Sequence, residues 1–261
     1  MGANIAKRFI GVILLPEYNV RVQRRIASAL SYFGREALRI VLPSWCIACE
    51  RELPLGDRTA SCCAACWASL PRISGAKCVS CALPLPAGEI CIDCLTSPLP
   101  VDWCEAWGAY RGPLERLLHA LKFQRHDFLD DALAALLDET LRDRDFDAVV
   151  AVPMHRAKER KRGYNQAELL ARALGRRIHV ACDMALLTRQ RRERATQSRL
   201  PKRDRAANVV GAFAASPRAD GKSILIVDDI CTTGETLRAC AAALRDAGAS
   251  RVCAVAVAKA V

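Results

Sequence analysis

Apolar positions along this chain alternate between short continuous runs and stripes at helical spacing. The continuous runs lack polar alternation, which is typical of strands covered on both faces of a parallel sheet, and they span 147–152, 224–227 and 252–257. Helically spaced stripes predict helices over 114–121, 128–141, 164–174 and 236–244, the last of them ending near Gly248. Residues 103–110 predict an edge strand. This alternation predicts an α/β domain whose parallel sheet is flanked by helices.

A further stripe lies nearer the start of the chain. Residues 22–41 place apolar side chains at helical spacing and arginines on the other faces, which predicts a basic amphipathic helix. Most such helices bury their stripe against protein, so docking on the cysteine-rich segment is the preferred interpretation, and weak association with a membrane surface is the alternative. The apolar run 9–15 is too short to span a bilayer, and no small-residue cleavage site follows it before Arg21. The sequence therefore predicts neither export nor a transmembrane segment.

Cysteine is used unusually often, with fourteen residues in the chain. Eight of them form four Cys-x-x-Cys pairs in a stretch that cannot build a core by burial alone: Cys46/Cys49, Cys63/Cys66, Cys78/Cys81 and Cys91/Cys94. This spacing suits two thiolates on one tetrahedral ion, so we expect two structural zinc sites, each saturated by four cysteines. Sequential pairing is the simplest arrangement, and interleaved pairing is the alternative. The remaining unpaired thiols favour a reducing compartment, the cytoplasm.

Two carboxylates and a hydroxyl-rich glycine turn follow the apolar run 224–227. Asp228 and Asp229 can accept hydrogen bonds from ribose hydroxyls or hold a hydrated Mg²⁺. The residues after them offer hydroxyl donors and a close backbone approach to a phosphate at a helix start: Cys231, Thr232, Thr233, Gly234, Glu235 and Thr236. Cys231 is expected to line the turn and to take no part in chemistry. The turn predicts a sugar-phosphate site, and a solvated strand end with a threonine cap is the alternative.

Positive charge is concentrated in one segment. Residues 156–205 hold sixteen Lys and Arg against five Asp and Glu, a net of +11 that equals the charge of the whole chain. Within it, residues 187–205 lose apolar periodicity and predict a mobile basic loop that includes Arg191, Arg192, Arg194, Thr196, Gln197 and Arg199. Such a strip attracts polyanions, so single-stranded DNA is the expected partner, bound through phosphates because this loop has no aromatic residue. A solubilising surface is the alternative.

The turn resembles the phosphoribosyl pyrophosphate (PRPP) motif of type I phosphoribosyltransferases. Further motifs resemble, in order and spacing, the ComF family of competence proteins: Val152-Pro153-Met154-His155, Arg162-Gly163-Tyr164-Asn165-Gln166, Thr196-Gln197, Arg205 and Asn208. That resemblance implies a double zinc-ribbon module followed by a type I phosphoribosyltransferase-like domain. The predicted divisions are 1–44 for the amphipathic helix region, 45–104 for the zinc module and 105–261 for the second domain. Glu235 departs from many transferases, which carry a glycine there.

The resemblance also assigns roles to residues outside the turn. It implies that the loop from Met154 to Gly163, with Met154, His155 and above all Arg162, binds the diphosphate of PRPP, and that Lys122 faces the site. A solvated charge at a helix end is the alternative for Lys122. By the same resemblance, residues 187–205 correspond in position to the flexible hood that closes over PRPP, with Mg²⁺ accompanying the ligand.

Three functions remain open from the sequence. The resemblance to ComF proteins implies the uptake or processing of single-stranded DNA during natural transformation, together with partner proteins of DNA import. An active Mg²⁺-dependent phosphoribosyltransferase is the second hypothesis, with Asp228 and Asp229 stabilising an oxocarbenium-like state. A PRPP-responsive sensor is the third.

Overall fold

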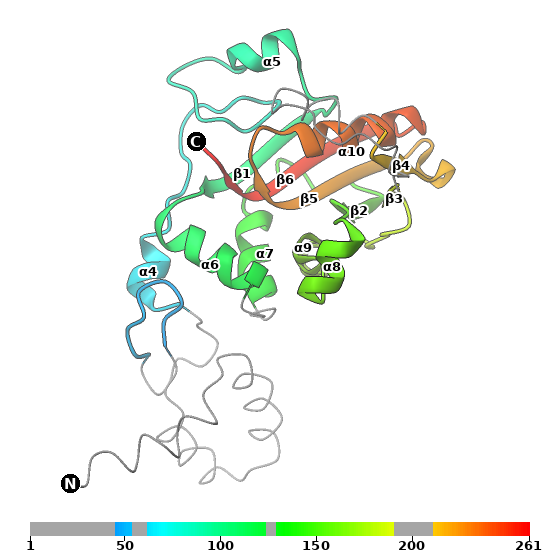
Figure 1. Cartoon of the computed structure of the whole chain (residues 1–261). Helices are drawn as coiled ribbons and strands as arrows, with labels where there is room; N and C mark the ends of the chain where they lie inside the picture. Colours follow the sequence, from blue (N-terminus) through cyan, green and yellow to red (C-terminus); the bar gives the residue numbers. More distant parts are fainter. Residues whose placement is uncertain (1–44, 54–61, 124–128, 191–210) are drawn as a thin grey trace, which may run out of the picture.

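The computed structural model describes residues 45–53, 62–123, 129–190 and 211–261, and its centre is a four-stranded parallel sheet (Figure 1). The strands lie in the order β1 (Trp103–Ala109), β6 (Arg251–Lys259), β5 (Ser223–Cys231) and β2 (Ala148–Ala151). Each neighbouring pair is parallel. The α/β class, the parallel sheet and the edge position of β1 predicted from the sequence are therefore confirmed.

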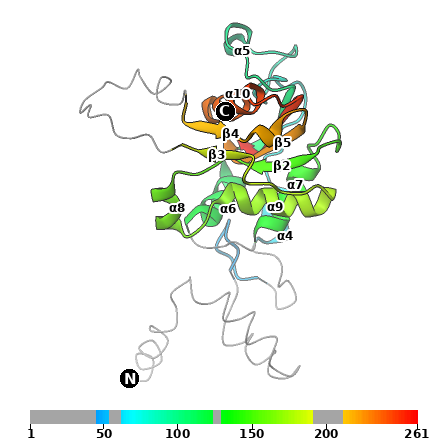
Figure 2. The ribbon, with the colours of Figure 1, turned by 90° about the vertical axis from the view of Figure 1, so that its right-hand side faces the viewer.

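Helices cover both faces of this sheet. One face is covered by α7 (Asp130–Asp138) and α9 (Gln166–Ile178), and α6 (Gly112–Phe123) lies on the same side (Figure 2). The other face is covered by α10 (Glu235–Asp246), which also packs on the short antiparallel pair β3 (Leu187–Arg189) and β4 (Phe213–Ala215). Because β5 and β6 lie in the middle of the sheet, their residues 224–227 and 252–258 are all buried, as an uninterrupted apolar run requires.

Two predicted loops contain regular structure. The segment 154–163 is not a loop, because it forms α8 (Arg156–Arg162). His155 caps this helix by accepting from Ala157 N, and Gly163 ends it in the left-handed region at φ 90°. The predicted loop 187–205 begins instead as strand β3, paired with β4. The rest of that segment, with Arg191, Arg192, Arg194, Thr196, Gln197 and Arg199, lies outside the described residues.

Strand β5 is longer than the apolar run 224–227 predicts. Pairing with β6 continues from Asp228 opposite Ala256 to Cys231 opposite Lys259. The acid pair therefore belongs to the last part of the strand. The sequence could not show this, because the extra length depends on a partner strand that is distant along the chain.

The cysteine-rich segment touches both sides of the sheet. Its short helix α4 (Ala64–Ala68) lies beside α6, whereas α5 (Ile92–Thr96) lies on the side of α10 (Figures 1 and 2). Between them, residues 71–79 run along the outer edge of β1, where Arg72 bridges Gly108 and Cys104 N donates to Val79 O. The predicted boundary at 104/105 falls within β1, and the domain limits remain a prediction.

The amphipathic helix expected over 22–41 lies outside the described residues. Within the ranges that the structure describes, no helix combines the length and the apolar character needed to cross a membrane.

Candidate functional site

The acid pair lies where the sheet opens on one side. β2 pairs with β5 only as far as Val227, whereas β6 pairs with β5 as far as Cys231. Beyond Val152 the chain leaves β5 and turns into α8, so the acid pair lacks a neighbouring strand on that side. Ligands of open α/β sheets bind in such a position, at the carboxyl ends of strands.

Polar side chains from two helices contact Asp229, which is buried, and a side chain from a third helix joins them through Gln166. Lys122, in the last turn of α6, places Nζ 2.5 Å from Asp229 Oδ2. Gln166, the first residue of α9, donates from Nε2 to Asp229 Oδ1 at 3.2 Å, and its own Oε1 accepts from Arg162 at the end of α8. The structure therefore brings Lys122, Arg162 and Asp229 into one network. Asp229 Oδ1 accepts a hydrogen bond, whereas buried Oδ2 makes none among the described residues and is held by Lys122 as an ion pair.

Asp228 has a different environment. Its Oδ1 accepts from the backbone N–H of Asp229 at 2.8 Å. Asp228 is partly buried, and the loss of solvent around its carboxyl raises the pKa well above its usual range; the charge of Asp229 raises this pKa further, whereas Lys122 lowers it. Ionising Asp228 in the folded protein therefore costs free energy, which a bound cation or hydroxyl donor would offset.

Replacement of Asp228 by asparagine is expected to stabilise the protein at pH 8 by about 0.5–2 kcal/mol, a usual gain from relieving an unfavourable functional position. Because the folded-state pKa is raised, the stability of the wild type falls as pH rises from the ordinary aspartate range through this higher pKa. The gain should therefore shrink towards zero at pH 4. Urea unfolding at both pH values measures the difference in stability between Asp228→Asn and the wild type. Asp246→Asn, at the C-terminal end of α10, is the control. Equal stability of Asp228→Asn and wild type at pH 8 would contradict the expectation.

The turn after β5 presents hydroxyl groups and a helix start. Thr232, Thr233 and Thr236 are exposed, and Gly234 precedes α10 at φ 84°, in the region that favours glycine. Gly234 has no side chain to cap the helix, and Glu235 N donates only a long bond of 3.5 Å to Thr233 Oγ1, so the next N–H groups of α10, those of Thr236 and Leu237, are available to an anion. This turn, residues 231–236, is called the phosphate turn below.

Buried Lys259 shapes the phosphate turn from behind. Its Nζ donates to the backbone carbonyl of Thr232 and lies 3.7 Å from Cys231 Sγ. Holding this carbonyl inward keeps a negative dipole away from the face on which an anion would bind. Sequence reasoning missed Lys259, and its only signal is a charge at the end of an otherwise apolar strand.

Glu235 does not oppose an anion at the turn. Its Oε1 lies 3.5 Å from Nε of Arg238, one helical turn later in α10. This pairing draws the carboxylate towards a cation and explains how Glu235 can occupy a position where a phosphate-binding turn would otherwise favour glycine. Arg238 was also missed, since it looks like an ordinary residue on the polar face of an amphipathic helix.

The other candidate residues occupy less direct positions. His155 is exposed, and its Nδ1 accepts the capping bond of α8, while Met154 is partly buried beside it. Cys231 is buried and donates weakly to Cys81 O at 3.8 Å. Asn165 caps α9 by accepting from Ala167 N, so it acts as a residue of the helix start.

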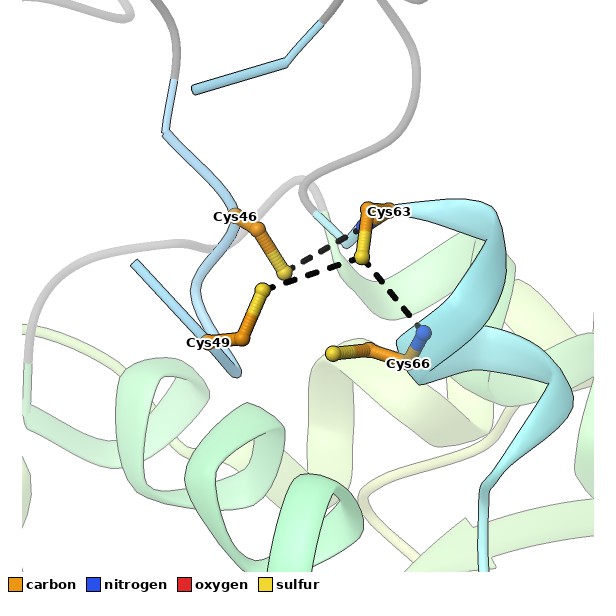
Figure 3. Close-up of side chains that lie close together, drawn as sticks. All are labelled: Cys46, Cys49, Cys63 and Cys66. Carbon is orange, nitrogen blue, oxygen red and sulfur yellow. Dashed lines mark hydrogen bonds between the residues drawn. The ribbon is translucent and has the colours of Figure 1, made fainter. Parts of the chain in front are cut away.

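The eight paired cysteines form two separate clusters in sequential order. Cys46, Cys49, Cys63 and Cys66 make up the first cluster (Figure 3), and Cys78, Cys81, Cys91 and Cys94 the second. Within each cluster the sulfur atoms lie within 4.8 Å of one another. The sulfurs of Cys49 and Cys63 are 3.8 Å apart, and those of Cys81 and Cys91 are 3.7 Å apart. Four sulfurs about 2.3 Å from zinc would be separated by about 3.8 Å, so the clusters fit tetrahedral zinc.

Each cluster also contains one thiol whose pKa is lowered, Cys46 in the first and Cys78 in the second. Burial opposes the thiolate of Cys46, but backbone N–H groups of Cys63, Cys49 and Ala48 outweigh it and lower the pKa to about 6. Burial is likewise outweighed at Cys78, where backbone N–H groups of Cys91, Cys81 and Ser80 lower the pKa to about 7. Because zinc binds thiolates, both clusters have the chemistry of structural zinc sites with no open position for a substrate.

Comparison with known protein families matches both parts of the chain. The double zinc ribbon domain matches residues 37–95, and the phosphoribosyl transferase domain matches residues 125–260. The DNA utilization protein YhgH of Escherichia coli (strain K12) is 34% identical over 221 residues, covering 82% of this chain and 96% of YhgH.

Two competence proteins are also similar to this chain. Competence protein F of Haemophilus influenzae is 30% identical over 172 residues, covering 62% of this chain and 75% of that protein. Competence protein ComFC of Bacillus subtilis is 28% identical over 196 residues, covering 71% of this chain and 78% of ComFC. A double zinc ribbon that precedes a phosphoribosyl transferase domain, together with these relatives, shows that the chain belongs to the ComF family.

Proposed function

We propose that this protein binds PRPP with Mg²⁺ at the phosphate turn and the acid pair, and that it uses this domain in the handling of single-stranded DNA. The observation that carries the proposal is the convergence of Lys122, Gln166 and Asp229 beside an uncapped helix start. A diphosphate ester of ribose needs cations and N–H donors for its phosphates, and acceptors for its hydroxyls. The site offers cations, N–H donors and acceptors together at the carboxyl end of β5.

Each group has a distinct task in this proposal. The N–H groups that begin α10 and the hydroxyls of Thr232, Thr233 and Thr236 bind the 5′-phosphate. Asp228 and Asp229 accept from the ribose hydroxyls, and Arg162 with Lys122 faces the diphosphate. Asp228, whose carboxylate has fewer protein partners, is the natural ligand for Mg²⁺, which would neutralise diphosphate charge.

The DNA part of the proposal is supported by the relatives and by charge. YhgH is named a DNA utilization protein, and two further relatives are named competence proteins. The exposed face of α8 carries Arg156, Lys158, Arg160 and Lys161, and α8 leads to Arg162 at the site. A strand of DNA bound along α8 would thus pass close to the acid pair. We place this activity in the cytoplasm, together with proteins of DNA import.

Calorimetric titration of the full chain with PRPP and Mg²⁺ tests the ligand. The proposal expects saturable binding that requires Mg²⁺, with inorganic phosphate and ribose 5-phosphate binding more weakly because each offers only part of the ligand. Absence of binding at millimolar PRPP would overturn it.

Measuring the release of diphosphate distinguishes an active transferase from a sensor that binds PRPP without turnover. An active transferase would release it from PRPP when an acceptor base is added, in proportion to enzyme and time. A sensor would bind PRPP without turnover. We favour the sensor because both oxygens of Asp229 are already tied to Lys122 and Gln166, so that a ligand that engages this carboxylate must rearrange contacts of two helices.

Charge reversal in the basic segment is expected to weaken binding of single-stranded DNA. With Arg191→Glu, Arg192→Glu and Arg194→Glu combined, the slope of log affinity against log salt should flatten by about 2, since each lost phosphate contact contributes about 0.7. Fluorescence anisotropy with a labelled oligonucleotide at several salt concentrations measures this slope. The matched control reverses three exposed arginines outside the strip, Arg51, Arg144 and Arg218. Equal slopes for the two triple variants would contradict a specific role of this segment.

A further inference from the structure

The segment that joins the second cysteine cluster to β1 lies directly against the phosphate turn. Buried Leu99 packs beside Gly234, where an added Cβ would be 3.3 Å from the leucine side chain. In the first turn of α10, Arg238 donates from Nη1 to Pro98 O at 2.5 Å and from Nη2 to Ser97 O at 2.6 Å. Residues 97–99 therefore contact the start of α10 at two places, Gly234 and Arg238.

The same segment is fixed to the second cluster. Ser97 ends helix α5, which carries Cys94, and its N–H donates to Asp93 O. Leu99 N donates to Ser80 Oγ at 2.8 Å, and Ser80 lies between Cys78 and Cys81. Residues 97–99 are thus held on one side by the Cys91–Cys94 pair and on the other by the Cys78–Cys81 pair.

A second contact joins this cluster to the turn without residues 97–99. Cys231 Sγ lies 3.8 Å from the carbonyl of Cys81, a ligand of the second cluster. Cys231 in turn precedes Thr232, whose carbonyl is held by Lys259. The cluster therefore supports the turn at its first residue as well as at its helix start.

We propose that the order of the second cysteine cluster, fixed by its zinc, holds the phosphate turn in the conformation that binds phosphate, and that Arg238 is the positioning residue that transmits it. This inference rests on the proposed sugar-phosphate site. A segment with so little apolar core is ordered mainly by its metal, so loss of the ion frees residues 97–99. Arg238 then loses its carbonyl partners, Leu99 leaves Gly234, and the N–H groups of α10 are no longer aligned.

The first cluster provides an internal comparison. It has the same ligand set but lies on the other side of the sheet, beside α6, where Arg116 donates to Ala48 O (Figure 1). Losing its ion should therefore disturb α6 locally, with the phosphate turn unaffected. The two clusters have the same four-cysteine ligand set, yet loss of zinc from the second cluster should disturb the phosphate turn and loss from the first should not.

The experiment uses full-length Cys91→Ser and Cys49→Ser variants, one for each cluster, beside the wild type. Zinc per chain is measured together with amide hydrogen exchange of peptides covering 231–238, which needs no PRPP. Each variant should lose about one zinc ion, and only Cys91→Ser should raise exchange in the turn, by about tenfold or more. Unchanged exchange after zinc loss in Cys91→Ser, or an equal rise in both variants, would overturn the proposal.

Arg238→Lys keeps the inference testable even where a cysteine variant fails to fold. Lysine retains the charge beside Glu235, but its compact ammonium group replaces the planar fork whose two ends reach the carbonyls of Pro98 and Ser97. We expect unchanged zinc content, faster exchange in the turn and about tenfold weaker PRPP binding, a change of about 1.4 kcal/mol. Unchanged exchange in this variant would overturn the role of Arg238. Because exchange is read without ligand, it decides the coupling even if the wild type does not bind PRPP, which would defeat only the proposed function.

Discussion

Asp229→Asn is expected to weaken Mg²⁺-dependent PRPP binding by about 100-fold, or about 2.8 kcal/mol. Asp229 is the buried acceptor at the centre of the site, and its charge holds Lys122 at 2.5 Å and orients Gln166. Asparagine has nearly the same shape, so the variant should fold, but it removes the charge and replaces one acceptor by a donor that faces either Lys122 or Gln166, both of which are donors themselves. Both the ribose contact and the position of the cation are then lost.

Calorimetry with PRPP and Mg²⁺ measures this loss, and thermal unfolding checks that the variant is folded. Asp246→Asn removes a carboxylate at the far end of the same helix that begins at the turn, so it should bind PRPP as the wild type does. Wild-type affinity in Asp229→Asn would show that Asp229 does not take part in binding.

Lys122→Met is expected to destabilise the protein by about 3 kcal/mol at pH 8, the usual cost of removing one partner from a buried ion pair. The side chains of Lys122 and Asp229 are 18% and 4% exposed, so water cannot replace the lost cation. Two adjacent carboxyl groups then remain without their nearest positive charge. Because Lys122 lowers the pKa of Asp228, its removal raises that pKa further, and the loss of stability should be smaller at pH 5.

Urea unfolding of Lys122→Met and of the double variant Lys122→Met/Asp229→Asn separates the causes. If the unpaired charge is responsible, the double variant should regain most of the lost stability, since neither charge then remains. Lys158→Met, on the exposed face of α8, should change stability by less than about 0.5 kcal/mol. A double variant less stable than Lys122→Met would contradict this account.

The sheet and its turn were predictable from local signals, whereas their supports were not. The runs 224–227 and 252–257 predicted buried strands because a central parallel strand has apolar neighbours on both faces. The cysteine spacing predicted two zinc clusters for a similarly local reason. Lys259 and Arg238 gave no such signal, because their partners are a backbone carbonyl far along the chain and the carbonyls of another module.

Lys122 shows where pattern reasoning reaches its limit. Its position at the end of a helix is compatible with a solvated charge and with a residue of the site, and the sequence alone left both open. Only the tertiary fold, which places the end of α6 near the end of β5, brings it to Asp229. Helix α8 was mistaken for a loop for a related reason, since its apolar positions are too few for a stripe and its capping bonds are made by His155 and Gly163.

Strand order has a consequence for biosynthesis. β6 is the last described strand to emerge from the ribosome, yet it lies between β1 and β5. Until residues 251–259 emerge, β1 cannot join the other strands, and the phosphate turn lacks Lys259. The cysteine clusters are synthesised before the sheet is complete, so they can bind their ions on the nascent chain. Zinc binding can therefore precede the insertion of β6 between β1 and β5.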